Sequence, residues 1–169
     1  MKYIPRLGAV ALLCAQGALA APVITSDFFA SKPPAATVHG KSCEVAQRYV
    51  DIINAGKYGE LKTLFADDAV FLTPVGKVLH GPQEIGDFYT SMIGALTPDI
   101  VPVSFISDGP ACVMELVAKT VKYADKGYQL SAIDHFTVNA EGKIANMIVY
   151  VRPHSLQKMA EEATPTKTP

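Results

Sequence analysis

The chain has 169 residues, of which 49% are hydrophobic and 18% are charged, and its formal net charge is −1 at pH 7. This length predicts one domain that is large enough to enclose a hydrophobic core. A nearly neutral, slightly acidic chain argues against nucleic acid or an anionic membrane surface as a partner.

Residues 1–21 have the features of an export signal. Lys2 and Arg6 give a positive start, an apolar run follows over 7–15, and Ala18-Leu19-Ala20 forms a small-x-small cleavage site. The apolar run is too short to cross a bilayer, so we expect no membrane anchor. We expect cleavage between Ala20 and Ala21 and a secreted or periplasmic protein. Cleavage removes two of the 15 basic residues and leaves 13 beside 16 acidic ones, a net charge of −3.

The segment 22–40 is rich in Pro, Ala and Ser and has no sustained period, which is typical of a flexible linker. The tail, 154–169, has the same character. Between them, we expect 41–153 to form one compact domain without internal repeats.

Helical patterns come first in this domain. Ser42 is expected to cap a helix that ends near Asn54. A short second helix follows, and a third begins at Gly81-Pro82, where a proline suits the first turn. The residues expected to face inward recur at helical spacing: Val45, Tyr49, Ile52 and Ile53, then Leu61, Leu64 and Phe65, then Ile85, Phe88, Tyr89 and Met92.

Five segments have strand patterns: 69–74, 100–107, 111–123, 129–138 and 144–151. Turn residues between the last four favour antiparallel hairpins. The sequence therefore predicts an α+β fold, in which three N-terminal helices pack on one face of a curved antiparallel sheet. A curved sheet closed by helices encloses a cone-shaped hollow, which is a natural pocket for a small molecule.

Cys43 and Cys112 remain after loss of the export signal. An oxidising compartment permits a disulfide between them. Because both lie in apolar surroundings, two buried thiols are the favoured interpretation. The disulfide stays open as the alternative.

Two polar residues stand on predicted apolar faces. Asp134 alternates with Ala132 and Phe136 on a strand, and Tyr49 lies on the apolar stripe of the first helix. Burial disfavours a charged carboxylate, so Asp134 is expected to be neutral. A neutral acid and a phenol that meet offer two donors to one oxygen, which binds a carbonyl or stabilises an enolate. The alternatives are a strand carboxylate paired with a backbone amide or a lysine, and an ordinary core tyrosine.

The pocket is expected to be lined by further residues that bind the apolar body of a ligand: Phe71, Thr73, Phe88, Met92, Leu130, Ala132, Phe136, Met147 and Val149. There is no GxSxG, GxxxxGK[ST] or CxxC motif, and the four histidines show no paired spacing. We therefore expect neither a metal nor a cofactor.

The domain resembles the nuclear transport factor 2-like superfamily, and within it the SnoaL-like and ketosteroid isomerase branch. The resemblance covers most of 41–153 and is strongest in QRYVDIINAGKYGELKTLFADDAVFLTPVG, LHGPQEIGDFY and AIDHFTVNAEGKIANMIVYV. It implies a cone-shaped fold and a homodimer. It also implies oxyanion-donor roles for Tyr49, after Arg48, and for Asp134. The position of the general base in those isomerases carries Thr73 here, and a threonine hydroxyl is too weakly basic to remove a proton from carbon.

Three hypotheses follow. The protein is an isomerase- or cyclase-type enzyme acting on a small apolar carbonyl compound, or a non-catalytic protein that binds such a compound. The third is an association module that pairs through its sheet and in which the cone has no ligand.

Overall fold

The computed structural model describes residues 31–121, 127–153 and 155. The expected export signal and nearly all of the expected tail lie outside the described residues. Within them, no helix has the length and apolarity needed to cross a membrane.

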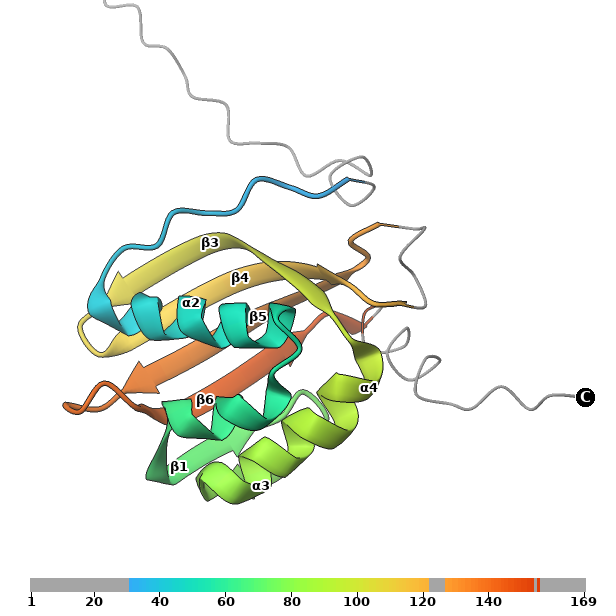
Figure 1. Ribbon diagram of the computed structural model, residues 1–169. Coiled ribbons are helices and arrows are strands. Elements are labelled where there is room, and N and C mark those ends of the chain that lie inside the picture. Colours follow the sequence, from blue (N-terminus) through green and yellow to red (C-terminus); the bar gives the residue numbers. More distant parts are fainter. Residues whose placement is uncertain (1–30, 122–126, 154, 156–169) are drawn as a thin grey trace, which may run out of the picture.

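Six strands form one curved sheet in the order β2-β1-β6-β5-β4-β3 (Figure 1). Strands β3 to β6 form a meander of antiparallel hairpins, as the turn residues predict. The strands are β1 (Phe65–Leu72), β2 (Val78–His80), β3 (Asp99–Asp108), β4 (Ala111–Lys119), β5 (Leu130–Val138) and β6 (Ile144–Val151).

The helices cover one face of this sheet (Figure 1), which confirms the α+β class. The expected second helix is the 3-10 helix η1, and the third continues through a π-helical turn, η2, into a last turn, α4. In chain order the helices are α2 (Lys41–Asn54), η1 (Tyr58–Leu64), α3 (Gly81–Phe88), η2 (Tyr89–Ile93) and α4 (Gly94–Leu96).

The prediction of an antiparallel sheet is wrong at one pair, because β1 runs parallel to β6. Turn residues fix the direction of strands that follow each other along the chain. They carry no information on β1 and β6, which are separated by most of the domain. The short strand β2, antiparallel to β1, was not predicted, because three residues give no detectable period.

The start of α2 also differs from the prediction. Gly40 precedes the helix with a φ of 84°, and a Cβ there would lie 2.3 Å from Ser107 Oγ, so only glycine fits. Ser42 does not cap the helix. Its hydroxyl donates to the carbonyl oxygen of Ala111 at 2.9 Å and lies 3.1 Å from Ser107 Oγ, which anchors the helix start to the β3–β4 hairpin.

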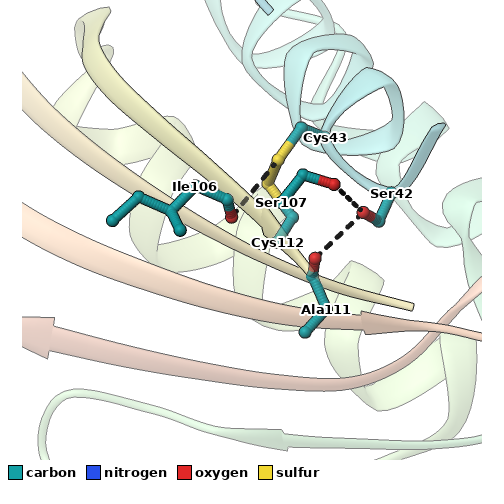
Figure 2. The surroundings of a disulfide bond; sticks show 6 residues. All are labelled: Ser42, Cys43, Ile106, Ser107, Ala111 and Cys112. Carbon is teal, nitrogen blue, oxygen red and sulfur yellow. Dashed lines mark hydrogen bonds between the residues drawn. A yellow bond between two sulfur atoms is a disulfide. The ribbon is translucent and has the colours of Figure 1, made fainter. Parts of the chain in front are cut away.

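Cys43 and Cys112 form a disulfide, so the favoured interpretation of two buried thiols is wrong. The bond joins α2 to β4, and both cysteines are fully buried (Figure 2). Apolar surroundings do not prevent the bond, because the chain brings the two Cα atoms to 5.1 Å, within the range that a disulfide spans.

The described part of the expected linker, 31–40, lies along β3 (Figure 1). The amide of Ala36 donates to the carbonyl oxygen of Pro102 at 2.9 Å, and Lys32 Nζ lies 3.1 Å from Asp99 Oδ1. This segment therefore covers part of an edge strand whose backbone groups would otherwise be open to pairing.

Candidate functional site

A cavity of about 590 Å³ lies between the helices and the inner face of the sheet. Its lining is mostly apolar and comes from α2, β1, the helices from α3 to α4, and strands β3 to β6. Val75 and Met92 belong to the lining, and their side chains are 69% and 45% exposed, so they mark where the cavity opens to solvent. A mostly apolar hollow with a few polar groups is typical of small-molecule sites.

Asp134 reaches this cavity from the middle of β5, where it pairs with Met114 on β4 and Val149 on β6. Its side chain is buried, and Oδ1 has no hydrogen-bond partner among the described residues. Burial raises the pKa of Asp134 to about 7, and the hydroxyl of Tyr49 opposes part of that rise. At neutral pH, Asp134 is therefore protonated in a large fraction of molecules.

Tyr49 reaches the same cavity from α2. Burial raises its pKa well above the ordinary value, and the neighbouring Tyr89 and Asp134 raise it further. The phenol is therefore neutral and remains a hydrogen-bond donor throughout the physiological pH range.

Tyr89 is a third residue of the cavity lining, and its helical spacing predicted only that it faces inward. Its hydroxyl lies 2.9 Å from that of Tyr49 and can also donate to Met147 Sδ at 3.6 Å. A tyrosine has one proton to donate. When Tyr89 donates to Tyr49, the proton of Tyr49 is free to point at Asp134 or at a ligand. The sequence indicated only that Tyr89 faces inward on the third predicted helix, and not that it contacts Tyr49.

Aromatic rings hold the two tyrosines in place. Tyr49 meets Tyr89 and Phe136 edge-on, with centroid distances of 5.7 and 5.4 Å. Phe71 stacks on Tyr89, with an angle of 8° between the ring planes. Such packing leaves little room for either phenol to rotate away from the cavity.

The expected lining residues divide into two groups. Six of the nine line the cavity: Phe71, Phe88, Met92, Leu130, Ala132 and Val149. Phe136 and Met147 are fully buried behind the tyrosines, and Thr73 is buried in the β1–β2 turn. None of these three lines the cavity.

Thr73 has a structural partner. Its Oγ1 accepts a hydrogen bond from the amide of Lys77 at 3.0 Å, and its own amide donates to the carbonyl oxygen of Lys77 at 2.9 Å. The alternation from Phe71 to Thr73 predicted a residue facing the pocket, but the turn begins at Thr73 and directs its hydroxyl to the turn's own backbone.

The ionisable side chains that line the cavity are Tyr49, Tyr89 and Asp134, within the part of the chain that the structure describes. This lining contains no histidine and no second carboxylate. The same described residues contain no cluster of three or more His, Cys, Asp or Glu that could hold a metal ion. Tyr49 and the protonated form of Asp134 thus each bring a hydrogen-bond donor to the lining of an apolar cavity.

Known proteins resemble this chain in sequence and in fold. A SnoaL-like domain family model matches residues 46–147. The chain is 28% identical over 108 residues to a steroid delta-isomerase from Nocardioides simplex, covering 63% of this chain and 85% of that protein.

Two solved structures share the fold. One is a steroid delta-isomerase from Pseudomonas aeruginosa, with a TM-score of 0.59 and 23% identity, covering 76% of this chain and 92% of that one. The other is SalBIII, an epoxide hydrolase/cyclase-like enzyme in polyether salinomycin pyran ring formation. Its TM-score is 0.57, its identity is 25%, and the match covers 67% of this chain and 92% of that one. Together with the six-stranded sheet and its helices, these matches confirm the predicted resemblance: the chain belongs to the SnoaL-like domain family and has the nuclear transport factor 2-like fold.

Proposed function

We propose that this protein binds a small, mostly apolar carbonyl or phenol compound, whose oxygen accepts hydrogen bonds from neutral Asp134 and from Tyr49. One observation carries the proposal. Oδ1 of Asp134 is buried, its residue lines the cavity, and it has no hydrogen-bond partner among the described residues. An unpartnered buried polar atom costs about 1–3 kcal/mol, so a ligand that supplies the partner is favoured.

The neutral state of both donors supports this choice of ligand. A charged carboxylate would repel a carbonyl oxygen, and burial raises the pKa of Asp134 to about 7, so that a large fraction of molecules carry the neutral acid at pH 7. The apolar lining favours a ring system such as a steroid, a terpenoid or a polyketide. The names of the steroid delta-isomerase from Nocardioides simplex and of the cyclase-like SalBIII agree with substrates of that kind.

The second candidate is an isomerase- or cyclase-type enzyme that acts on the same compounds. Its support is the pKa of Asp134, because an acid with a pKa near 7 is well suited to proton transfer at neutral pH. Asp134 would then donate to the oxygen and also carry the proton, since among the described residues the cavity lining contains no other carboxylate and no histidine. A protein that only binds the compound needs no such double role for Asp134, so binding is the first candidate and catalysis the second.

Titration of the full chain with 2-naphthol and with a steroid enone, followed by ligand absorbance, tests the proposal. We expect both to bind. Asp134→Asn and Tyr49→Phe should each weaken 2-naphthol about tenfold, the value of one buried hydrogen bond. Ser91→Ala is the matched control, because Ser91 lines the cavity but donates to the carbonyl oxygen of Asp87. Unchanged affinity in both site variants would eliminate the proposal.

Hydrogen exchange separates binding from turnover. An enolisable ketone is incubated with the protein in D₂O, and deuterium at the carbon beside the carbonyl is followed by NMR. Exchange that Asp134→Asn abolishes would favour the enzyme, whereas binding without exchange would favour the carrier. Thr73→Asp should not restore exchange, because position 73 does not line the cavity.

We also propose that the protein is exported. The disulfide supports this proposal, because such bonds persist mainly in oxidising compartments. Cell fractionation and mass spectrometry of the recovered chain test it, and we expect a mature N-terminus at Ala21. An intact N-terminus in the cytosolic fraction would contradict it.

A homodimer that pairs through the outer face of the sheet is a further proposal. Ile133 and Tyr150, opposite each other on β5 and β6, are 44% and 58% exposed there. Sedimentation of the free protein tests the pairing, and a strict monomer would contradict it. A dimer that binds no ligand in the titration above would instead support an association module.

A further inference from the structure

The disulfide lies on the helix that carries one donor and on the strand beside the other. Cys43 precedes Tyr49 by six residues in α2. Cys112 on β4 pairs with Phe136 on β5, and Asp134 is the preceding residue on the inner face of β5. The covalent bond therefore joins the two elements whose relative position sets how Tyr49 and Asp134 meet.

A direct path of contacts links the bond to the site. The ring of Phe136 meets the ring of Tyr49 edge-on at 5.4 Å, and both are buried. Phe136 thus lies opposite Cys112 in the sheet and against Tyr49 in the core. A movement of the start of α2 away from β4 would loosen this packing first.

The two ends of α2 are held differently. At the C-terminal end, the side chain of Asn54 exchanges two hydrogen bonds of 2.8 Å with the backbone of Ile100 on β3. At the N-terminal end, the other side-chain attachment is the hydroxyl of Ser42, which donates to Ala111 (Figure 2). A contact of 3.7 Å between Cys43 Sγ and the Ile106 carbonyl oxygen is no hydrogen bond, because a disulfide sulfur carries no proton.

We propose that the Cys43–Cys112 disulfide is a positioning element of the oxyanion site. It holds α2 at the distance from the sheet at which the Tyr49 hydroxyl and Asp134 can both donate to the same ligand oxygen. The inference rests on the proposed function. Hydrogen bonds are sensitive to such a shift, because donor and acceptor must lie within about 2.7–3.2 Å of each other. Loss of the bond should therefore weaken oxygen recognition even while the domain stays folded.

The first test compares the oxidised protein with the same protein after reduction by dithiothreitol, which converts the disulfide to two thiols and is itself oxidised to its cyclic disulfide. The side chains are then unchanged and only the covalent bond is lost. We expect affinity for 2-naphthol to fall about tenfold and to return on reoxidation. If the reduced protein unfolds, Cys43→Val combined with Cys112→Ala replaces the bond by apolar packing.

A double-mutant cycle distinguishes positioning from general loosening. In a Tyr49→Phe background, removal of the disulfide should change affinity less than twofold, because the donor that it positions is already gone. Leu79→Ala is the control for stability, since Leu79 is buried on β2, at the opposite edge of the sheet from β3, and does not line the cavity. It should lower stability and leave affinity unchanged. Equal losses from disulfide removal in both backgrounds would overturn the inference.

A readout without ligand separates this inference from the proposed function. The pKa of Asp134 is followed by the carbon chemical shift of its carboxyl group. The ionisable groups that line the cavity with it, within the described residues, are Tyr49 from α2 and Tyr89 from η2. Tyr49 lowers the pKa of Asp134, so we expect a higher pKa without the disulfide. An unchanged pKa would overturn the inference, whereas failure of the wild-type protein to bind either probe would overturn only the proposed function.

Discussion

The hydroxyl oxygens of Tyr49 and Tyr89 lie 2.9 Å apart, although 40 residues separate them in the chain. Tyr49 comes from α2 and Tyr89 from the π-helical turn η2, so the pair joins two helices above the sheet. A tyrosine that receives a hydrogen bond becomes a stronger donor itself, because hydrogen bonds in a chain polarise one another. Either hydroxyl can be the donor in this pair, and in the arrangement in which Tyr89 donates, it strengthens a bond from Tyr49 to a ligand.

The first prediction concerns this pair. Tyr89→Phe should weaken 2-naphthol binding by about 0.5–1 kcal/mol, less than Tyr49→Phe, because it removes support for a donor and not the donor. Absorbance titration of both variants measures the difference. In the double variant, Tyr89→Phe should add little to the effect of Tyr49→Phe. An equal effect in both backgrounds would mean that Tyr89 acts on the ligand independently.

The second prediction is a pH dependence of stability. The pKa of Asp134 is 3.8 in the unfolded chain and about 7 in the folded one, so the folded state retains a proton that the unfolded state releases. The contribution of Asp134 to the free energy of unfolding should therefore be largest below pH 4 and should fall as the pH rises to 7. The slope is at most about 1.4 kcal/mol per pH unit, and above pH 7 it vanishes.

Urea unfolding of the wild-type protein and of Asp134→Asn at several pH values measures this slope. The asparagine cannot ionise, so the difference in unfolding free energy between the two proteins isolates the contribution of Asp134 from that of histidines. A difference that stays constant from pH 4 to pH 7 would mean that Asp134 is charged in the folded protein.

The sequence predicted the direction in which a side chain faces wherever apolar residues recur at a regular spacing along one strand or helix. Asp134 was placed on the inner face of its strand by the period of two, and the inward stripe of α2 placed Tyr49 toward it. Both residues line one cavity. The partnership of Tyr49 with Tyr89 could not be predicted, because it depends on how two helices cross.

Long-range relationships account for the other differences. The parallel pairing of β1 with β6 and the bond between Cys43 and Cys112 join segments that no local pattern relates. The prediction for Thr73 failed for a local reason. The strand period ends where the turn begins, and the hydroxyl accepts a hydrogen bond from the Lys77 amide instead of facing the cavity. The period alone does not show at which residue it stops.

The third prediction follows from that turn. Thr73→Ala should cost about 0.5–1.5 kcal/mol of stability, because the amide of Lys77 loses its side-chain acceptor in a part-buried bond across the turn. Ligand affinity should change less than twofold, because Thr73 does not line the cavity. Thr63→Ala is the matched control, since its exposed hydroxyl donates to the carbonyl oxygen of Glu60 and its loss should cost under about 0.5 kcal/mol. A large loss of affinity in Thr73→Ala would place its hydroxyl in the binding site.

The fourth prediction concerns the C-terminal end of α2. Asn54 donates to the carbonyl oxygen of Ile100 and accepts from its amide, both at 2.8 Å, so its side chain acts as an additional strand residue beside β3. Asn54→Ala should destabilise the fold by about 1–3 kcal/mol, because two backbone groups lose their partners together. Gln47→Ala, which removes an exposed bond to Asp51 in the same helix, should cost under about 0.5 kcal/mol. Urea unfolding compares the two. Equal losses would show that α2 is not held at this end, and its position over the sheet would then depend on the disulfide and on core packing.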